Sequence, residues 1–200
     1  GEINISNMGP GFFNYYYSIQ GDCPASDSIQ IEIVEFIEAN IINPAPICEG
    51  DDTLIITATN GGGIWSGNGV LDINNGVYDF SSFLQGSYII VYETNGLCSD
   101  IDSSVLIINP IPIIDFDINQ SDPCLGVEIS VQNNSPNINN ENYFWFINDA
   151  LYSTSKLPSF NLGLGNYTLA LIVENQYGCK SNITYDETVY VYDTIALPSP

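Results

Sequence analysis

The chain has 200 residues, of which 24 are acidic and only two, Lys156 and Lys180, are basic; it contains no Arg and no His. The net charge of −22 excludes nucleic acid as a partner, because phosphate contacts need cations, and it excludes attraction to an anionic membrane surface. Without His, nucleophilic triads based on His are excluded, and zinc or copper sites lack their usual ligands.

One strand–turn–strand pattern occurs three times along the chain. Its first strand opens with Gly and an aromatic residue, and it leads to a cysteine: residues 11–17 to Cys23, 86–92 to Cys98, and 165–171 to Cys179. A second alternating run follows each copy, at residues 28–34, 103–108 and 184–191. The steps of 75 and 79 residues between the glycines match one small β-domain, so the sequence predicts a tandem array.

A tryptophan precedes the second and third copies at nearly equal distances. Trp65 lies 21 residues before Gly86, and Trp145 lies 20 residues before Gly165. A buried Trp on a central strand is typical of immunoglobulin-type sandwiches. We therefore expect Trp65 and Trp145 in two separate cores.

Tyrosines begin the late strands of the same two modules. Tyr88 and Tyr167 stand where a sandwich carries its tyrosine corner, so we expect both in the core. In each of the segments 88–92 and 167–171, the first, third and fifth residues form the expected inward face, since successive side chains of a strand alternate. In the first copy the same alternation turns Tyr16 away from the core. Its exposed ring would suit stacking on a sugar, but we expect it to pack against an adjacent sheet or a neighbouring subunit.

The five cysteines are regularly placed. Cys48 and Cys98 flank the middle module, and Cys124 and Cys179 flank the last one. One disulfide per module is the expectation, with the partner of Cys23 lying upstream of residue 1. Such a framework requires an oxidising, extracellular compartment.

An acidic strand near residue 115 raises the question of calcium. Asp115, Asp117 and Asn119 occupy the first three ligand positions of an EF-hand loop, but Gln120 replaces the required Gly and Gly126 replaces the bidentate Glu. The pattern favours a first strand whose acids face water. A second set of acids near the module ends is a weaker candidate for an oxygen cage: Asp51, Asp52, Asp100 and Asp102. We therefore expect no cofactor, with Ca²⁺ at the domain junctions as the alternative.

Catalysis finds no support in these patterns. Paired carboxylates remain the only available chemistry, and they need a cleft that small sandwiches rarely build. We therefore expect that the protein is not an enzyme.

The middle module resembles a known group. Its segments 47–50, 63–69, 86–88 and 95–98 look like the Ig-like repeats of giant Bacteroidetes cell-surface proteins. The last module resembles a PKD-type domain in segments 143–146, 165–169 and 175–179, and it departs from that family at 147–149, where a Gly-Asp-Gly turn is usual.

The resemblance and the repeats together suggest an organisation for the chain. Residues 1–42 would be the C-terminal half of an Ig-like domain, 43–110 an Ig-like β-sandwich, 111–192 a PKD-like β-sandwich, and 193–200 a linker to a following module. The fold class is therefore all-β, with tandem Ig-like and PKD-like β-sandwiches.

The resemblance implies a role at the cell surface. Such proteins are exported by the type IX system and serve as adhesins, gliding-motility proteins or accessory modules of secreted enzymes. The expected function is a non-catalytic structural or adhesive segment of a long extracellular protein. The alternatives are a subunit of a surface filament and a carbohydrate-binding accessory module. Expected partners are neighbouring modules, surface glycans or identical chains, with no nucleic acid and no membrane insertion.

The resemblance also suggests O-glycosylation. Three Asp-Ser/Thr-aliphatic triplets match the signal used in Bacteroidetes, which makes Ser28, Thr53 and Thr194 the candidate residues. Acidic, Thr-rich strands also produce such triplets by chance.

Overall fold

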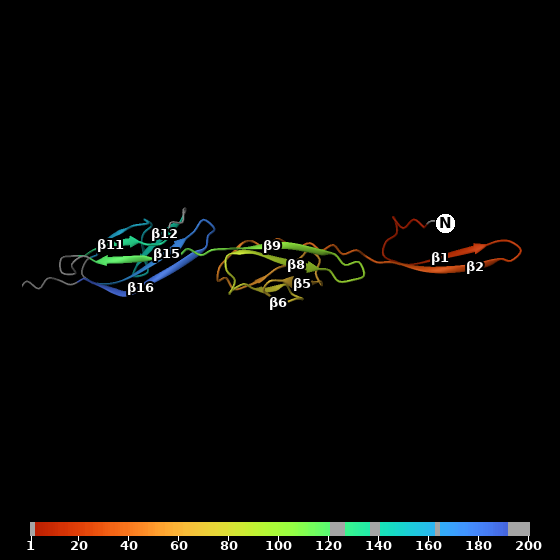
Figure 1. The fold of residues 1–200 in the computed structure, drawn as a ribbon, viewed down its shortest axis with the longest axis horizontal. Coiled ribbons are helices and arrows are strands. Elements are labelled where there is room, and N and C mark those ends of the chain that lie inside the picture. The colour runs from red at the N-terminus through yellow and green to blue at the C-terminus, as the bar shows by residue number, and fades with distance from the viewer. Residues whose placement is uncertain (1–2, 121–126, 137–140, 163–164, 192–200) are drawn as a thin grey trace, which may run out of the picture. The chain divides into compact units, whose positions relative to one another are not determined.

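The computed structural model describes residues 3–120, 127–136, 141–162 and 165–191, and each regular element in these ranges is a β-strand (Figure 1). The predicted all-β class is confirmed. Within these ranges there is no helix long and apolar enough to cross a membrane. Contacts divide the chain into two compact units. The first contains Gly1–Pro46, Gly50–Ser82 and Ser87–Ile107, and the second contains Ile47–Glu49, Phe83–Gly86 and Ile108–Pro200.

The first two strands form an antiparallel hairpin. β1 (Gly11–Ile19) pairs with β2 (Ala25–Ile33) along its whole length. This confirms the strands expected near 11–17 and 28–34. Tyr16 is 81% exposed, as the alternation predicts, whereas Tyr15 is half-buried and its hydroxyl donates to the Met8 sulfur over 3.0 Å.

Seven strands build the middle module: β3 (Ile47–Cys48), β4 (Thr53–Ile55), β5 (Ile64–Gly67), β6 (Val70–Asp72), β7 (Val77–Asp79), β8 (Gly86–Glu93) and β9 (Ile101–Asn109). They form one sheet in the order β3-β9-β8-β5 and another in the order β4-β7-β6. Trp65 lies 4.5 Å from the ring of Tyr92 and 6.4 Å from the ring of Tyr78. Since Tyr78 belongs to the second sheet, these rings join both sheets in one sandwich core.

The turn before β7 requires glycine. Gly76 has φ +65°, and a Cβ there would meet the Ile56 carbonyl oxygen and the Trp65 ring. The Gly76 carbonyl in turn accepts a hydrogen bond from the Ile56 amide over 2.9 Å. The backbone at Gly76 therefore lies too close to the Trp65 ring to leave room for a side chain.

The last module is a second sandwich. One sheet has the order β10 (Phe116–Gln120), β11 (Val127–Asn133), β14 (Ser159–Leu162), and the other has the order β13 (Ala150–Ser153), β12 (Asn142–Ile147), β15 (Gly165–Glu174), β16 (Lys180–Val191). Trp145 is fully buried, with the rings of Phe116 and Phe160 at 5.4 and 5.7 Å. Its indole N–H donates to the Ser155 carbonyl over 3.1 Å.

A two-residue turn replaces the Gly-Asp-Gly sequence usual in PKD domains. Asn148 and Asp149 both have positive φ, 47° and 65°, and they connect β12 to β13. Two such residues make a primed turn, whose twist suits an antiparallel hairpin. The Asn148 Oδ1 also accepts from the Thr168 amide over 2.9 Å, which ties the turn to β15.

The inward faces expected for the two Gly-x-Tyr strands are confirmed. Ile90, Leu169 and Leu171 are fully buried, and Tyr92 is 1% exposed. Alternation of side chains was sufficient to predict them, because one face of each strand is covered by the opposite sheet. The domain boundaries at 42, 110 and 192 stay predictions.

Candidate functional site: two cysteine hairpins and the segments they hold

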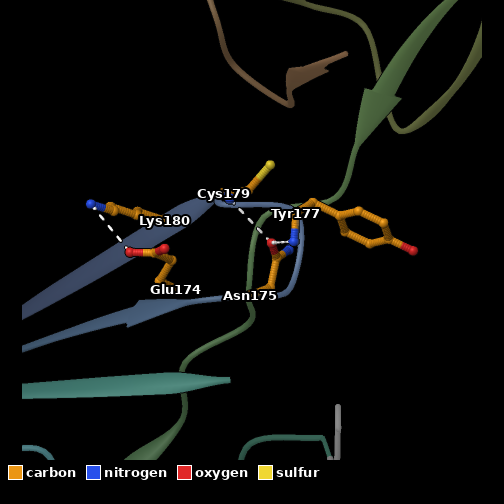
Figure 2. Close-up of polar contacts among 5 residues, drawn as sticks. All are labelled: Glu174, Asn175, Tyr177, Cys179 and Lys180. Carbon is orange, nitrogen blue, oxygen red and sulfur yellow. Dashed lines mark hydrogen bonds and ion pairs between the residues drawn. The ribbon is translucent and has the colours of Figure 1, made fainter. Parts of the chain in front are cut away.

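Asn175 organises the hairpin between β15 and β16. Its side chain is 6% exposed, and its Oδ1 accepts hydrogen bonds from the amides of Tyr177 and Cys179 over 3.0 and 3.1 Å (Figure 2). The backbone amide of Asn175 donates to the Cys179 carbonyl over 3.0 Å. These bonds satisfy a buried polar side chain and fix the place of Cys179.

The same side chain also holds the segment that enters the last module. Asn175 Nδ2 donates to the Pro110 carbonyl over 2.7 Å. Proline has no amide to pair, but its carbonyl remains a full acceptor. One buried amide group therefore connects the hairpin to the chain immediately after β9.

Cys179 forms a disulfide with Cys48. The Cα atoms are 5.6 Å apart, the two residues are separated by 131 positions, and Cys179 is 1% exposed. Strand pairing fixes the position of Cys48, because β3 runs parallel to the end of β9, with Cys48 opposite Asn109. The Glu49 amide donates to the Asn109 carbonyl over 2.9 Å.

This bond corrects the expected pairing within each module. Cys48 lies opposite Asn109, the last residue of β9, whereas Cys98 precedes Ile101, the first residue of that strand. Nine residues of strand span about 30 Å, and a disulfide needs Cα atoms within about 7 Å. Cys48 therefore cannot reach Cys98. Within the described residues Cys98 and Cys23 are exposed free thiols, and Cys124 lies outside those residues.

One of the two lysines lies beside the bonded cysteine. Lys180 Nζ is 3.3 Å from Glu174 Oε2, across the base of the hairpin (Figure 2). The lysine side chain is 62% exposed, so water screens the pair and it contributes about 1 kcal/mol or less. The hairpin depends mainly on Asn175 and the disulfide.

Thr94 occupies the corresponding place in the middle module. It is 2% exposed and follows the Gly-x-Tyr strand β8, as Asn175 follows β15. Its hydroxyl donates to the Ile37 carbonyl over 3.0 Å and accepts from the Asp100 amide over 2.8 Å. A buried polar side chain thus again joins a hairpin to the segment that enters its module.

Two carboxylates extend this hold on the entering segment. Asp100 Oδ2 accepts from the Ala39 amide over 2.9 Å, and Asp102 Oδ2 accepts from the Ile41 amide over 2.8 Å. The sequence suggested that these acids could form an oxygen cage for a cation, but in the structure their carboxylates accept hydrogen bonds from backbone amides. No group of three or more His, Cys, Asp or Glu side chains suited to a metal occurs among the described residues.

The acidic strand near 115 has the expected form. Phe116 is 6% exposed, whereas Asp115 and Asp117 face water. Asn134 Nδ2 donates to Asp117 Oδ2 over 2.8 Å, which occupies one carboxylate oxygen. The interpretation as a first strand of the sandwich is confirmed.

Not all of the expected core aromatics lie deep in the structure. Trp65 is 4% exposed and Trp145 is fully buried, but Tyr88 and Tyr167 are only half-buried. Sequence reasoning missed four buried rings: Tyr78, Phe80, Tyr143 and Phe160. Tyr92 is not among them, because it lies on the inward face that the alternation predicted for its strand. Tyr78 and Phe80 belong to a region of short strands with no comparable repeat.

Two of the glycosylation candidates are accessible. Ser28 and Thr53 are exposed on β2 and β4, while Thr194 lies outside the described residues. A shallow hollow beside Tyr16 is lined also by Tyr15, Tyr17 and Ile29. Glycan attachment and glycan binding at these places stay predictions.

No family model matches the chain, and no curated protein matches it. Solved structures of low similarity include the eight N-terminal Ig domains of Down Syndrome Cell Adhesion Molecule, at 13% identity and a TM-score of 0.49, covering 88% of this chain and 31% of that one. Fibronectin(III)-like modules of Clostridium thermocellum CbhA match at 10% identity and a TM-score of 0.38, covering 78% and 94%. Mouse cadherin-23 EC22–24 matches at 15% identity and a TM-score of 0.33, covering 96% and 77%. The chain spans less than a third of the first of these structures, and none of the three identifies a function.

Proposed function

We propose that this chain is a non-catalytic spacer or adhesive segment of a long extracellular, multidomain surface protein. The observation that carries the proposal is the Cys48–Cys179 disulfide, which closes a loop of 131 positions around most of both sandwich modules. Enzymes place reactive groups in a cleft, whereas here the buried polar side chains Thr94 and Asn175 are used to hold the backbone.

The location follows from redox chemistry and charge. A structural disulfide persists in an oxidising compartment, and the disulfide-bonded Cys179 is buried. The net charge of −22 favours solubility outside the cell. The sequence resemblance to Bacteroidetes surface repeats supports export through the type IX system and work as an adhesin or gliding-motility protein.

The disulfide defines how the chain carries tension. When the two ends of the chain are pulled, the load passes from Cys48 directly to Cys179, because the covalent bond is the shorter path. The residues between them then carry no load. A spacer built in this way keeps its modules folded while it transmits force.

Single-molecule extension of the whole chain tests this role. We expect the oxidised chain to lengthen only through the residues outside the loop, and the Cys48→Ser variant to release about 45 nm more contour length. Cys98→Ser serves as the matched control, because that thiol is free and exposed. Equal contour lengths for the wild-type chain and the Cys48→Ser variant would contradict the proposed role.

A specific observation favours assembly with identical chains as a second candidate function. The β1–β2 hairpin has its own two-stranded sheet, and its ring-bearing residues Phe12, Tyr16 and Tyr17 are 65%, 81% and 69% exposed. An exposed two-stranded sheet offers an edge for strand addition. Light scattering over a concentration series tests this candidate, and a purely monomeric chain would exclude it.

A further inference from the structure

The two core tryptophans differ in how their indole N–H groups are used. The N–H of Trp145 donates to the Ser155 carbonyl over 3.1 Å. The N–H of Trp65 donates to no group in the described part of the chain, although this residue is only 4% exposed. Among the described residues, Glu141 Oε1 is the single side-chain polar atom that is both enclosed and unpaired, so Trp65 Nε1 retains contact with solvent. A donor on a nearly buried side chain is therefore left open for a partner.

Trp65 lines a pocket of the middle module. The pocket has a volume of about 210 Å³, with Ile56 and Ala58 on its apolar side and Asn74 and Asn75 on its polar side. Pockets that hold drug-sized ligands have volumes of roughly 300–1,000 Å³. The smaller pocket beside Trp65 therefore suits a single ring rather than an extended molecule.

Gly76 keeps the open donor uncovered. A Cβ at this position would lie 3.0 Å from Trp65 Nε1, and the two residues before it, Asn74 and Asn75, line the pocket. The indole nitrogen therefore lies beside the turn that supplies the polar side chains. The ring of Tyr92 packs against Trp65 with the centroids 4.5 Å apart, so the N–H edge of the indole, rather than that face, is offered to a ligand.

The glycine loop at the mouth of the pocket is fixed by Tyr92. The Tyr92 hydroxyl donates to the Asn60 carbonyl over 2.5 Å and accepts from the Gly63 amide over 2.8 Å, one bond on each side of the loop. Between them, Gly61 and Gly62 line the pocket, and a Cβ on either would meet nothing within 4 Å. The mouth is thus open and preformed, which lowers the entropy lost when a ligand binds.

The charges around the pocket disfavour an anionic ligand. The Asp72 carboxylate accepts from the backbone amides of Asn74 and Asn75 over 2.9 and 3.2 Å, and from the Asn75 side chain over 2.8 Å. These bonds place a negative charge behind the polar wall. The two lysines of the chain, Lys156 and Lys180, belong to the last module. A ligand for this pocket is therefore neutral and hydrogen-bonding.

We propose that the pocket binds a neutral sugar ring, such as the terminal residue of a surface glycan. A sugar oxygen accepts from the Trp65 N–H. The side-chain amide of Asn74 and the side-chain oxygen of Asn75 bond further hydroxyl groups. The carbon atoms of the ring lie on Ile56 and Ala58. The inference rests on the proposed function only in that it gives the adhesive segment a ligand.

Titration of the isotope-labelled native chain tests the site by nuclear magnetic resonance. The chain has two tryptophans, so it gives two indole N–H signals, and Trp65→Phe assigns them. The probes are the methyl glycosides of glucose, galactose and N-acetylglucosamine, each up to about 50 mM, because ligands this small bind with a Kd in the millimolar range. We expect at least one probe to shift the Trp65 signal saturably and to leave the Trp145 signal in place. No shift, or equal shifts of both signals, would overturn the proposal.

A charged probe tests the class of ligand. Methyl glucuronide has the same ring with an added carboxylate, and it should bind at least about tenfold more weakly than the best neutral glycoside. Equal affinities would overturn the assignment of a neutral ligand.

Variants of two asparagines test the polar wall. The Asn74 side chain is exposed and makes no hydrogen bond within the described part of the chain, so Asn74→Ala should fold normally and bind the sugar about tenfold more weakly. Asn68→Ala, at an exposed position in a turn outside the pocket, is the matched control and should bind like the wild type. Equal effects of the two variants would contradict the site.

The exposed hairpin ring offers a competing place for a sugar. Loss of binding in Tyr16→Ala, together with wild-type binding in Asn74→Ala, would place the ligand on the hairpin and overturn the pocket. Sugar titration and single-molecule extension are separate measurements. A spacer without a sugar site and a sugar site without the load-bearing disulfide are therefore each recognisable.

Discussion

Trp145 is the residue on which the last module most depends. It is fully buried, it contacts Phe116 and Phe160, and its N–H satisfies the Ser155 carbonyl. Trp145→Ala should lower the free energy of unfolding by about 3–5 kcal/mol, because it leaves a cavity and an unpaired carbonyl. Urea unfolding measures the change. Leu157→Ala, at a side chain 57% exposed, should stay within about 0.5 kcal/mol, and equal losses for both would contradict the assigned core.

Tyr78 makes stability depend on pH in the alkaline range. Burial raises the pKa of Tyr78 to about 12, and its hydroxyl donates to the Ser66 carbonyl over 3.0 Å. The unfolded chain loses this proton near pH 10, so between about pH 10 and 12 it binds fewer protons than the folded chain, and the free energy of unfolding falls as pH rises. Urea midpoints across this window should fall less steeply in Tyr78→Phe. A wild-type midpoint that does not change would exclude the effect.

At the scale of elements, the turn before β7 allows a matched comparison of two glycines. Gly76→Ala places a Cβ against the Ile56 carbonyl at φ +65°, so it should destabilise the middle module by about 1–3 kcal/mol. Gly61→Ala adds its Cβ in open space and should be neutral or slightly stabilising. Thermal unfolding followed by tryptophan fluorescence compares them. Equal effects would show that the turn does not constrain the chain.

The elements also show what the sequence could and could not predict. Alternation in 86–92 and 165–171 predicted buried Ile90 and Leu169, because each strand has one face on a core. It could not predict the partner of Cys48, since parallel pairing of a two-residue strand with Asn109 leaves no periodic signal. Thr94 and Asn175 were missed for a related reason: each is a single polar residue whose role appears only when the entering segment lies beside it.

At the scale of the whole molecule, 24 acidic residues face two lysines, so self-repulsion should oppose the folded state at low salt. Raising sodium chloride from about 10 to 150 mM shortens the Debye length from about 30 to 8 Å and should raise the melting temperature. Calcium chloride at matched ionic strength should give the same rise if screening alone acts. A saturable increase specific to calcium would instead reveal a bound cation and revive the oxygen-cage alternative.

The closed loop between Cys48 and Cys179 also changes what a proteolytic cut does to the molecule. An enzyme that cleaves after lysine finds one target inside the loop, Lys156, and one immediately outside it, Lys180. A cut after Lys156 hydrolyses one peptide bond but releases no fragment, because the disulfide still joins the two pieces. Only a cut after Lys180, whose ammonium is paired with Glu174, detaches a fragment. A single cut anywhere between Cys48 and Cys179 therefore leaves all the residues of the chain covalently joined.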